Sequence, residues 1–167
     1  MPETTKAACP QVTIFTDGGA IGNPGPGGYG AVLMGGGARK ELAGGYRLTT
    51  NNRMEMMAAI VALEALKGQC SATLYTDSQY LSRAVTEGWA KRWQANGWKR
   101  NAKERALNPD LWERLLKLLG RHEVQFVWVR GHAGNSENER CHELVMQVVG
   151  DGNLPADEPY EREARAT

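Results

Sequence analysis

The segment that decides the fold is Val12-Thr13-Ile14-Phe15-Thr16-Asp17-Gly18-Gly19. Its β-branched and aromatic residues favour a buried strand over 12–16. The strand ends in Asp17, and the two glycines that follow let the backbone turn freely. Because open α/β sheets bind ligands at the carboxyl ends of their strands, Asp17 is a candidate site residue. The alternative is that Asp17 only terminates the strand, since Asp-Gly is a common turn pair.

The pattern of the whole chain predicts an α/β protein with the element order βββαβα…αβα. After a glycine-rich loop over 18–28, further strands are expected over 29–34, 41–47, 72–76 and 124–129. Helices are expected from about 52 to 66, 78 to 87, 109 to 119 and 137 to 149, and the first should turn Met54, Met57, Ala58, Val61 and Ala65 toward the sheet. The order predicts a five-stranded mixed sheet, three antiparallel strands then two parallel, with helices on both faces.

Length and charge indicate one domain with a local basic surface. The 167 residues suffice for one sizeable core. We expect a flexible leader over 1–10, one domain over 11–149 and a flexible acidic tail over 150–167. Residues 83–105 hold seven basic and two acidic side chains, whereas residues 151–167 hold five acidic and two basic ones. A basic patch on a chain of net charge +1 indicates one anionic contact surface.

The termini and the cysteines indicate the compartment. No apolar run approaches the roughly 20 residues that span a bilayer, and no apolar signal core follows Met1. Cys9, Cys70 and Cys141 are widely separated, and their spacing fits no metal motif. We therefore expect a cytoplasmic protein in a reducing compartment, without membrane contact.

Three carboxylates occupy corresponding places in this topology. Asp17 and Asp77 each end a strand, and Glu55 sits in the first turn of the intervening helix. If the two strands are parallel neighbours, their ends lie about 5 Å apart. Like charges this close repel unless hard cations such as Mg²⁺ lie between them. Two such ions can clamp the attacking and leaving oxygens of a phosphodiester. Each residue taken singly also has a structural alternative. Glu55 would then do no more than complement the helix dipole, and Asp77 would be a turn residue that ends the strand.

At this point the chain resembles the bacterial type 1 ribonuclease H (ribonuclease HI) family. The matching segments follow the family's order through residues 11–149: Ile14-Phe15-Thr16-Asp17-Gly18, Gly22-Asn23-Pro24-Gly25-Pro26-Gly27-Gly28-Tyr29-Gly30, Thr50-Asn51-Asn52-Arg53-Met54-Glu55, Thr76-Asp77-Ser78-Gln79-Tyr80, Gly131-His132-Ala133-Gly134 and Glu137-Asn138-Glu139-Arg140-Cys141. The resemblance implies a ribonuclease H-like fold and a metal-dependent endoribonuclease. Such an enzyme hydrolyses the RNA strand of RNA–DNA hybrids by a two-metal mechanism and leaves 5′-phosphate and 3′-hydroxyl ends. It also implies a monomer in the cytoplasm with a role in DNA replication.

The same resemblance implies residue roles. Asp17, Glu55 and Asp77 would bind the metals, and His132 would assist proton movement or product departure. One position departs from the family, because His142 stands where its fourth metal-binding aspartate is expected. The cofactor expected from the resemblance is Mg²⁺. Because an imidazole suits Mn²⁺ better than Mg²⁺, a preference for Mn²⁺ is possible. Alternatively, His142 only hydrogen-bonds a metal-bound water.

Substrate contacts follow from the resemblance as well. Asn23, Asn51, Asn52 and Gln79 resemble minor-groove contacts, and amides suit 2′-hydroxyls and base edges. Thr50 resembles a residue that contacts a DNA phosphate. The segment 88–108 resembles the family's basic handle. Its candidate nucleic-acid-binding residues are Trp89, Lys91, Trp93, Lys99 and Arg100. The alternatives are turn formation and helix capping for the amides, packing for Trp89, Trp93 and Trp98, and a solvated face for the basic residues.

Three functions are compatible with the sequence. The first is a hybrid-specific endoribonuclease, and the second is an impaired enzyme that mainly binds hybrids, because of His142. The third is a transposase or integrase core that cuts DNA, which the short chain and the basic segment disfavour.

Overall fold

The computed structural model describes residues 10–130 and 135–166 of the chain. It contains one five-stranded sheet in the order β3-β2-β1-β4-β5. β1, β2 and β3 are antiparallel neighbours, whereas β1 pairs with β4, and β4 with β5, in parallel. The predicted mixed sheet is therefore confirmed. The strands are β1 (Gln11–Ala20), β2 (Gly25–Gly35), β3 (Ala38–Thr49), β4 (Ser71–Thr76) and β5 (Glu123–Trp128).

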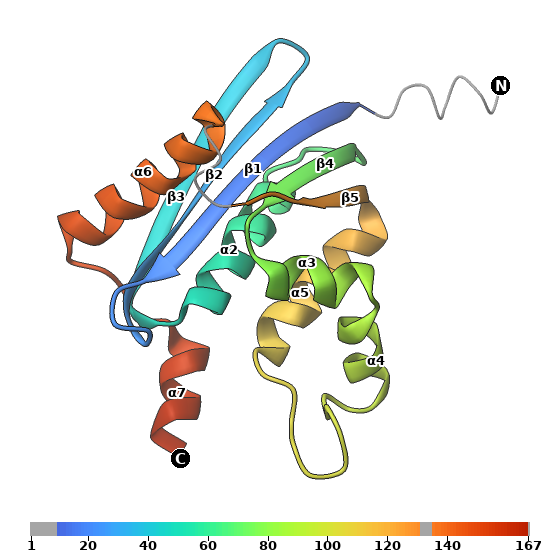
Figure 1. Ribbon diagram of the computed structural model, residues 1–167, viewed down its shortest axis with the longest axis vertical. Coiled ribbons are helices and arrows are strands. Elements are labelled where there is room, and N and C mark those ends of the chain that lie inside the picture. The colour runs from blue at the N-terminus through green and yellow to red at the C-terminus, as the bar shows by residue number, and fades with distance from the viewer. Residues whose placement is uncertain (1–9, 131–134, 167) are drawn as a thin grey trace, which may run out of the picture.

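Helices cover both faces of this sheet, as predicted (Figure 1). On β1, a Cβ added to Gly18 would meet the backbone of Met54 in α2. On β2, one added to Gly30 would meet Cys141 in α6. These two helices therefore lie on opposite faces and approach the strands closely where glycine replaces a side chain. The helices are α2 (Asn51–Glu64), α3 (Gln79–Thr86), α4 (Trp89–Ala95), α5 (Pro109–Arg121), α6 (Ser136–Asp151) and α7 (Glu158–Ala166).

The crossover helix α2 lies at the centre of the core. Its N-cap is Thr50, whose hydroxyl accepts a hydrogen bond from the backbone N–H of Arg53 at 3.2 Å. Met54, Met57 and Ala58 are buried as predicted, but Met56 and Ile60 are buried too. A second layer that includes Trp112 of α5 belongs to the same core cluster, so α2 has protein on several sides. Full burial of one such side chain contributes about 2 kcal/mol.

The glycine-rich segment 18–28 is more regular than the predicted loop. β1 continues to Ala20 and β2 begins at Gly25, so only residues 21–24 separate them. Asp17 therefore does not end its strand, because it pairs with Gly30 in the antiparallel ladder. A Cβ on Gly27 would lie 2.7 Å from Thr49 and 2.8 Å from the Gly19 carbonyl oxygen. The glycines thus allow close packing between strands, which a composition-based reading takes for a loop.

The basic segment forms α4 and an irregular loop that leads to α5. Trp89, Trp93 and Trp98 are half-buried and pack against the main core. The Trp93 ring lies 6.1 Å from that of Trp112 and 6.3 Å from that of Trp89. This packing supports the structural alternative for the tryptophans, and a handle function stays a prediction.

The prediction of a flexible tail over 150–167 is wrong. Residues 158–166 form α7, and Asp157 just before it is buried. Its carboxylate accepts hydrogen bonds from Arg53 Nε and from the Thr49 hydroxyl, both at 2.8 Å. The carboxylate of Glu161 accepts hydrogen bonds from Nε of Arg47 at 2.9 Å and from its Nη2 at 2.8 Å. The acidic composition of this segment suggests a solvated tail, but two of its acidic residues, Asp157 and Glu161, are the partners of Arg53 and Arg47.

Candidate active site

Asp17, Glu55 and Asp77 converge at one place on the sheet. One ligand oxygen from each carboxylate lies within 4.8 Å of the other two. Asp17 comes from β1, Asp77 directly follows β4, and Glu55 projects from α2. The structure brings together the three residues that the sequence predicts to bind metal.

Two features of the backbone produce this convergence. The parallel ladder between β1 and β4 ends at Phe15 and Tyr75, so the following residues diverge around a common opening. Gly18 lets α2 approach, because a Cβ there would lie 2.3 Å from the Met54 carbonyl carbon. The sequence predicts Glu55 in the first turn of the helix. In the structure it is the fifth residue and lies beyond that turn. The helix dipole alternative therefore loses its basis.

The electrostatics of the cluster favour a bound cation. Burial, followed by the charges of Asp77 and Asp17, raises the pKa of Glu55 well above its usual value. Burial and then the charge of Asp77 raise the pKa of Asp17. Within the described residues, Oε1 of Glu55 and Oδ1 of Asp77 are buried and accept no hydrogen bond. Buried carboxylate oxygens without donors fit a hard divalent cation such as Mg²⁺ or Mn²⁺.

His142 lies at the rim of this cluster. Its Nδ1 is 3.2 Å from Oδ2 of Asp17, and its side chain is 46% exposed. The prediction that His142 serves the site is thus consistent with its position. This contact also lowers the pKa of Asp17, against the larger effect of burial.

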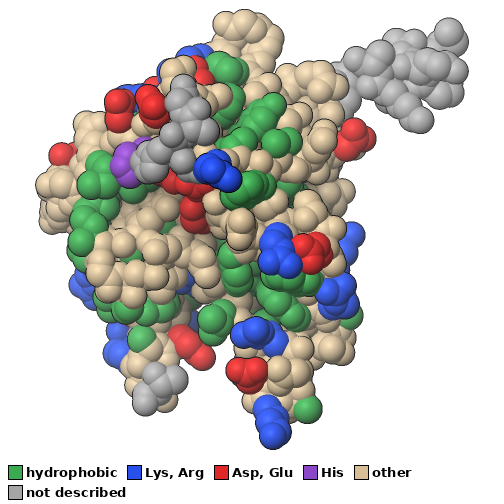
Figure 2. Space-filling model, in the orientation of Figure 1, with side chains coloured by type: hydrophobic (Ala, Val, Ile, Leu, Met, Phe, Trp, Pro, Cys, Tyr) green, Lys and Arg blue, Asp and Glu red, His purple; other side chains and the backbone are tan. Residues whose placement is uncertain are grey.

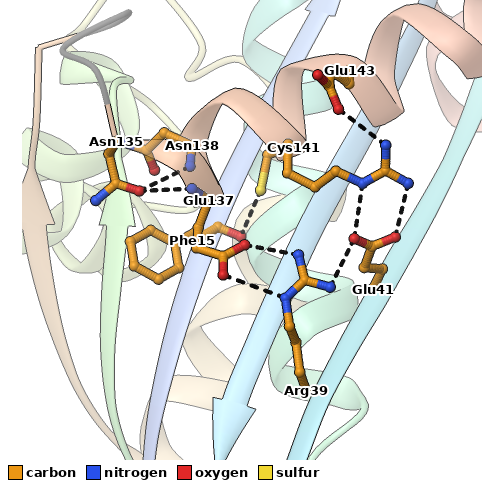
Figure 3. Close-up of polar contacts among 9 residues, drawn as sticks. Phe15, Arg39, Glu41, Asn135, Glu137, Asn138, Cys141 and Glu143 are labelled. Atoms are coloured by element: carbon orange, nitrogen blue, oxygen red, sulfur yellow. Dashed lines mark hydrogen bonds and ion pairs between the residues drawn. The ribbon is translucent and has the colours of Figure 1, made fainter.

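Helix α6 carries His142, and an ion-pair network fixes it to β3 (Figure 3). Arg39 pairs with Glu137 at 2.8 Å, and Arg140 pairs with Glu41 at 2.8 Å. The thiol of Cys141 donates to the Phe15 carbonyl oxygen at 3.3 Å. Burial raises the pKa of that thiol to about 12, so it remains a donor at neutral pH. The two ion pairs and the thiol hydrogen bond together set the position of α6 relative to β3 and β1.

A cavity of about 410 Å³, here called the catalytic cavity, opens over the carboxylates. In Figure 2 acidic side chains gather in a hollow of the surface beside a histidine. Several residues that line it are not among those that the sequence predicts. The spacing of Asn138 from His142, one helical turn, is a signal that could have identified Asn138. The missed residues are Ile21, Asn138, Glu139, Val145, Met146 and Val149.

The predicted amide contacts surround the neighbouring turn. Asn51 lines the catalytic cavity, and its Oδ1 accepts from the Ala20 N–H at 2.7 Å. Asn23 Oδ1 accepts from the Asn51 N–H at 3.0 Å. Asn23, Thr50 and Asn52 line a second cavity of about 610 Å³. The side-chain carbonyl oxygens of Asn23 and Asn51 and the Thr50 hydroxyl accept local backbone hydrogen bonds, as the structural alternative for the amides expects.

The other predicted contacts are more dispersed. Gln79 is exposed at the start of α3, two residues after Asp77. Trp89, Trp93 and Arg100 line a cavity of about 470 Å³. Lys91 and Lys99 are exposed on the same basic segment. His132 lies outside the described residues.

This fold and its three convergent carboxylates are those of a divalent-metal-dependent nuclease. The family model described as RNase H matches residues 9–149. The chain is 65% identical to the ribonuclease H of Syntrophus aciditrophicus over 95% of its length and 93% of that protein's. It is 55% identical to the ribonuclease HI of Synechocystis, over 90% of this chain and 94% of that one.

A solved structure agrees with these sequence matches. LC9-RNase H1, titled a type 1 RNase H with the type 2 active-site motif, superposes with a TM-score of 0.75. It is 31% identical, covering 86% of this chain and 74% of that one. The chain belongs to the ribonuclease H family, and it is an endoribonuclease. No helix in the described ranges 10–130 and 135–166 is long and apolar enough to cross a membrane.

Proposed function

We propose that this ribonuclease H hydrolyses the RNA strand of RNA–DNA hybrids at Asp17, Glu55 and Asp77 by a two-metal mechanism. The observation that carries the proposal is the convergence of the three carboxylates within 4.8 Å, with two buried oxygens that accept no hydrogen bond from a described residue. Mg²⁺ is the proposed cofactor, and Mn²⁺ is the proposed alternative. The products carry 5′-phosphate and 3′-hydroxyl ends.

The side chains around the metal ions have separate roles. When bound, the metal ions supply Lewis acidity toward the scissile phosphate. Asp17 lies between Asp77 and His142 and contributes to both sides of the site. The His142 ring orients the Asp17 carboxylate through the 3.2 Å contact. His132 assists proton movement or product departure, as the family resemblance implies.

Substrate discrimination rests on the amides beside the catalytic cavity. The carbonyl oxygens of Asn23 and Asn51 accept backbone hydrogen bonds, which leaves their NH₂ groups as donors to the substrate. Such donors suit the 2′-hydroxyls and base edges of a minor groove. Thr50, Asn52 and Gln79 extend the same surface, and Trp89, Trp93, Lys91, Lys99 and Arg100 contact the DNA strand. The enzyme acts as a cytoplasmic monomer.

A second candidate function is hybrid binding with little cleavage, because His142 replaces a carboxylate beside Asp17. A fluorescently labelled RNA–DNA hybrid, incubated with Mg²⁺ or with Mn²⁺, separates the two functions. We expect cleavage of the RNA strand with at least one metal and none of duplex DNA.

Asp17→Asn is the matched control, because the amide keeps the shape of the side chain and removes its charge. This variant should lose more than about 90% of the rate, a barrier increase of at least about 1.4 kcal/mol. Comparable cutting of duplex DNA, or full activity of folded Asp17→Asn, would overturn the proposal.

A further inference from the structure

Trp128, the last residue of β5, is a large aromatic side chain outside the hydrophobic core. It is 43% exposed, and within the described residues it belongs to neither core cluster. Phenylalanine would cover most of the same apolar surface. What tryptophan adds is one ring N–H, which can only donate a hydrogen bond. The group of Trp128 with a distinct chemical role is therefore this N–H.

The ring N–H of Trp128 donates to the backbone carbonyl oxygen of Asp77 at 3.1 Å. The parallel strands β4 and β5 lie side by side, and their ladder ends at the pair of Thr76 and Trp128 (Figure 1). Asp77 is the first residue beyond this ladder. The indole therefore reaches past the last strand pair and holds the backbone of one of the three clustered carboxylates.

The peptide unit between Asp77 and Ser78 is held at both ends. Its carbonyl oxygen accepts from the Trp128 ring, and its N–H donates to the hydroxyl of Thr76 at 3.1 Å. The Thr76 side chain is fully buried, so it offers a fixed acceptor. Because a peptide unit is planar and rigid, hydrogen bonds at its two ends fix its orientation. They thereby fix the ψ angle of Asp77 and the direction in which its side chain leaves the backbone.

The Asp77 carboxylate depends on this backbone support. Its Oδ1 is buried and accepts no hydrogen bond from a described residue. One of its oxygens lies within 4.8 Å of ligand oxygens of Asp17 and Glu55. Like charges at this separation repel, so the carboxylates of the metal-free protein are driven apart. The backbone of Asp77 must therefore hold the carboxylate where a cation can bind it.

We propose that Trp128 is a positioning residue of the nuclease site, which together with Thr76 orients the Asp77 carboxylate toward a divalent cation. The proposal rests on the proposed function and adds β5 to the elements that build the site. Trp128 is not among the described residues that line the catalytic cavity, so it acts through Asp77. Groups that orient a metal ligand without touching the metal commonly change metal affinity about tenfold or more.

The test measures Mg²⁺ binding to the full chain by calorimetry without nucleic acid, with a parallel series in Mn²⁺. Trp128→Phe keeps a flat aromatic ring and removes the donor, and it should raise the Kd of the metal about tenfold. Thr76→Val removes the acceptor at the other end of the same peptide unit and should raise the Kd by a similar factor. Trp98→Phe is the matched control. Because Trp98 packs against the main core and does not line the catalytic cavity, this variant should leave the Kd unchanged.

Cleavage kinetics separate positioning from substrate contact. In Trp128→Phe the Mg²⁺ concentration for half-maximal cleavage should rise about tenfold, whereas KM for the hybrid at saturating Mg²⁺ should equal that of the wild type. A raised KM with an unchanged Kd for Mg²⁺ would show that the exposed ring contacts the substrate, which would overturn the inference. Thermal melts in chelator report on folding. A variant that melts earlier but binds Mg²⁺ like the wild type would reduce Trp128 to a structural role and would also overturn it.

Asp77→Asn distinguishes this inference from the proposed function, because the variant should lose metal binding if Asp77 is a ligand. If the wild type cleaves hybrids and Asp77→Asn loses Mg²⁺ binding, but Trp128→Phe binds Mg²⁺ like the wild type, this inference is wrong and the proposed function stands. A wild-type protein that neither binds Mg²⁺ or Mn²⁺ nor cleaves hybrids would refute the proposed function and this inference with it.

Discussion

The His142 imidazole takes the place where the family resemblance leads one to expect a carboxylate. Its Nδ1 lies 3.2 Å from Asp17, whose pKa is already raised by burial and by Asp77. A fourth carboxylate at this rim would add negative charge to a cluster that repels itself without a cation. We therefore expect the histidine to favour binding of a hard cation less than a carboxylate would, and to leave less charge repulsion in the metal-free site.

This expectation is tested by His142→Asp. The added carboxylate should lower the Mg²⁺ concentration for half-maximal cleavage. It should also destabilise the metal-free protein by on the order of 1 kcal/mol, because the new charge is close to Asp17 but half-exposed. A Mg²⁺ titration of cleavage and thermal melts in chelator measure the two effects. His142→Ala controls for the lost contact, and an unchanged midpoint together with an unchanged melt for His142→Asp would place residue 142 outside the metal site.

A second histidine has a structural role far from the carboxylates. His122 is 4% exposed, and its Nδ1 accepts a hydrogen bond from the Cys70 N–H at 3.1 Å. Within the described residues its Nε2 is buried without a partner. Burial, with a smaller effect of Arg121, lowers the pKa of His122. The folded protein therefore holds this ring in its neutral form.

The sign of the resulting pH dependence follows from linkage. In the unfolded chain a histidine takes up its proton near pH 6.5, whereas the folded protein resists protonation until lower pH. The contribution of His122 to stability is thus complete above pH 6.5 and is lost as the pH falls below it, by at most about 1.4 kcal/mol per pH unit. His122→Asn, whose Oδ1 can accept from Cys70, should flatten this part of the stability curve in urea melts between pH 7 and pH 5. An identical slope in both proteins would exclude His122 as its source.

Among the helices, α2 determines whether the site exists. It supplies Glu55, and it can approach β1 only because residue 18 has no Cβ. The atoms that would meet a Cβ belong to the backbone of Met54 and Glu55, which rotamer changes cannot move. The position of one carboxylate thus depends on a glycine in the neighbouring strand.

Gly18→Ala should therefore displace α2 and with it Glu55. We expect a loss of about 2–3 kcal/mol in the free energy of unfolding, as for overpacked cores, and at least a tenfold loss of cleavage rate. Gly120→Ala in α5 is the matched control, since a Cβ there meets no atom within 4 Å. Its stability should stay the same or rise slightly, because alanine favours helix. Wild-type activity in Gly18→Ala would show that α2 tolerates the shift.

Helix α7 illustrates how tertiary contacts override composition. Residues 150–167 are acidic and weakly apolar, which alone indicates disorder. Without Asp157, however, the Nε of the buried Arg53 would lose the acceptor that it has at 2.8 Å, although Asp110 would still balance its charge. Ion pairs that are buried and hydrogen-bonded at several points are costly to break from one side. The tail is ordered because it completes this network.

Across the protein, the carboxylate cluster links metal binding to global stability. The pKa values of Asp17 and Glu55 are raised, so their burial stabilises the protein below the usual carboxylate pKa, and this contribution is lost as the pH rises. At neutral pH the metal-free site is therefore a source of instability. A cation that binds only the folded state removes it by mass action.

Mg²⁺ should consequently raise the melting temperature at pH 7.5, with about 2.7 kcal/mol gained at a hundredfold excess over its Kd. Glu55→Gln should raise the melting temperature in chelator, reduce the gain from Mg²⁺ and abolish cleavage. Calorimetric melts with chelator and with Mg²⁺ compare the two proteins. This link would be contradicted by a wild-type melting temperature that does not change with Mg²⁺. It would also be contradicted if Mg²⁺ raised the melting temperature of Glu55→Gln as much as that of the wild type.

The sheet topology, the crossover helices and the identity of the three carboxylates can all be predicted from the sequence alone. Local propensities and the chain order of Asp17, Glu55 and Asp77 carry that information, because each can be read within a few residues or from a short motif. Only the tertiary contacts account for three other features: the strand continuation through 18–20, the burial of α2 on several sides and the ordered α7. The order of α7 depends on partners more than 30 residues away, such as Thr49 and Arg53 for Asp157, and the strand continuation depends on pairing with residues 27–29 of β2. No local pattern contains the geometry of such a contact, since its energy arises only when both partners are removed from water together.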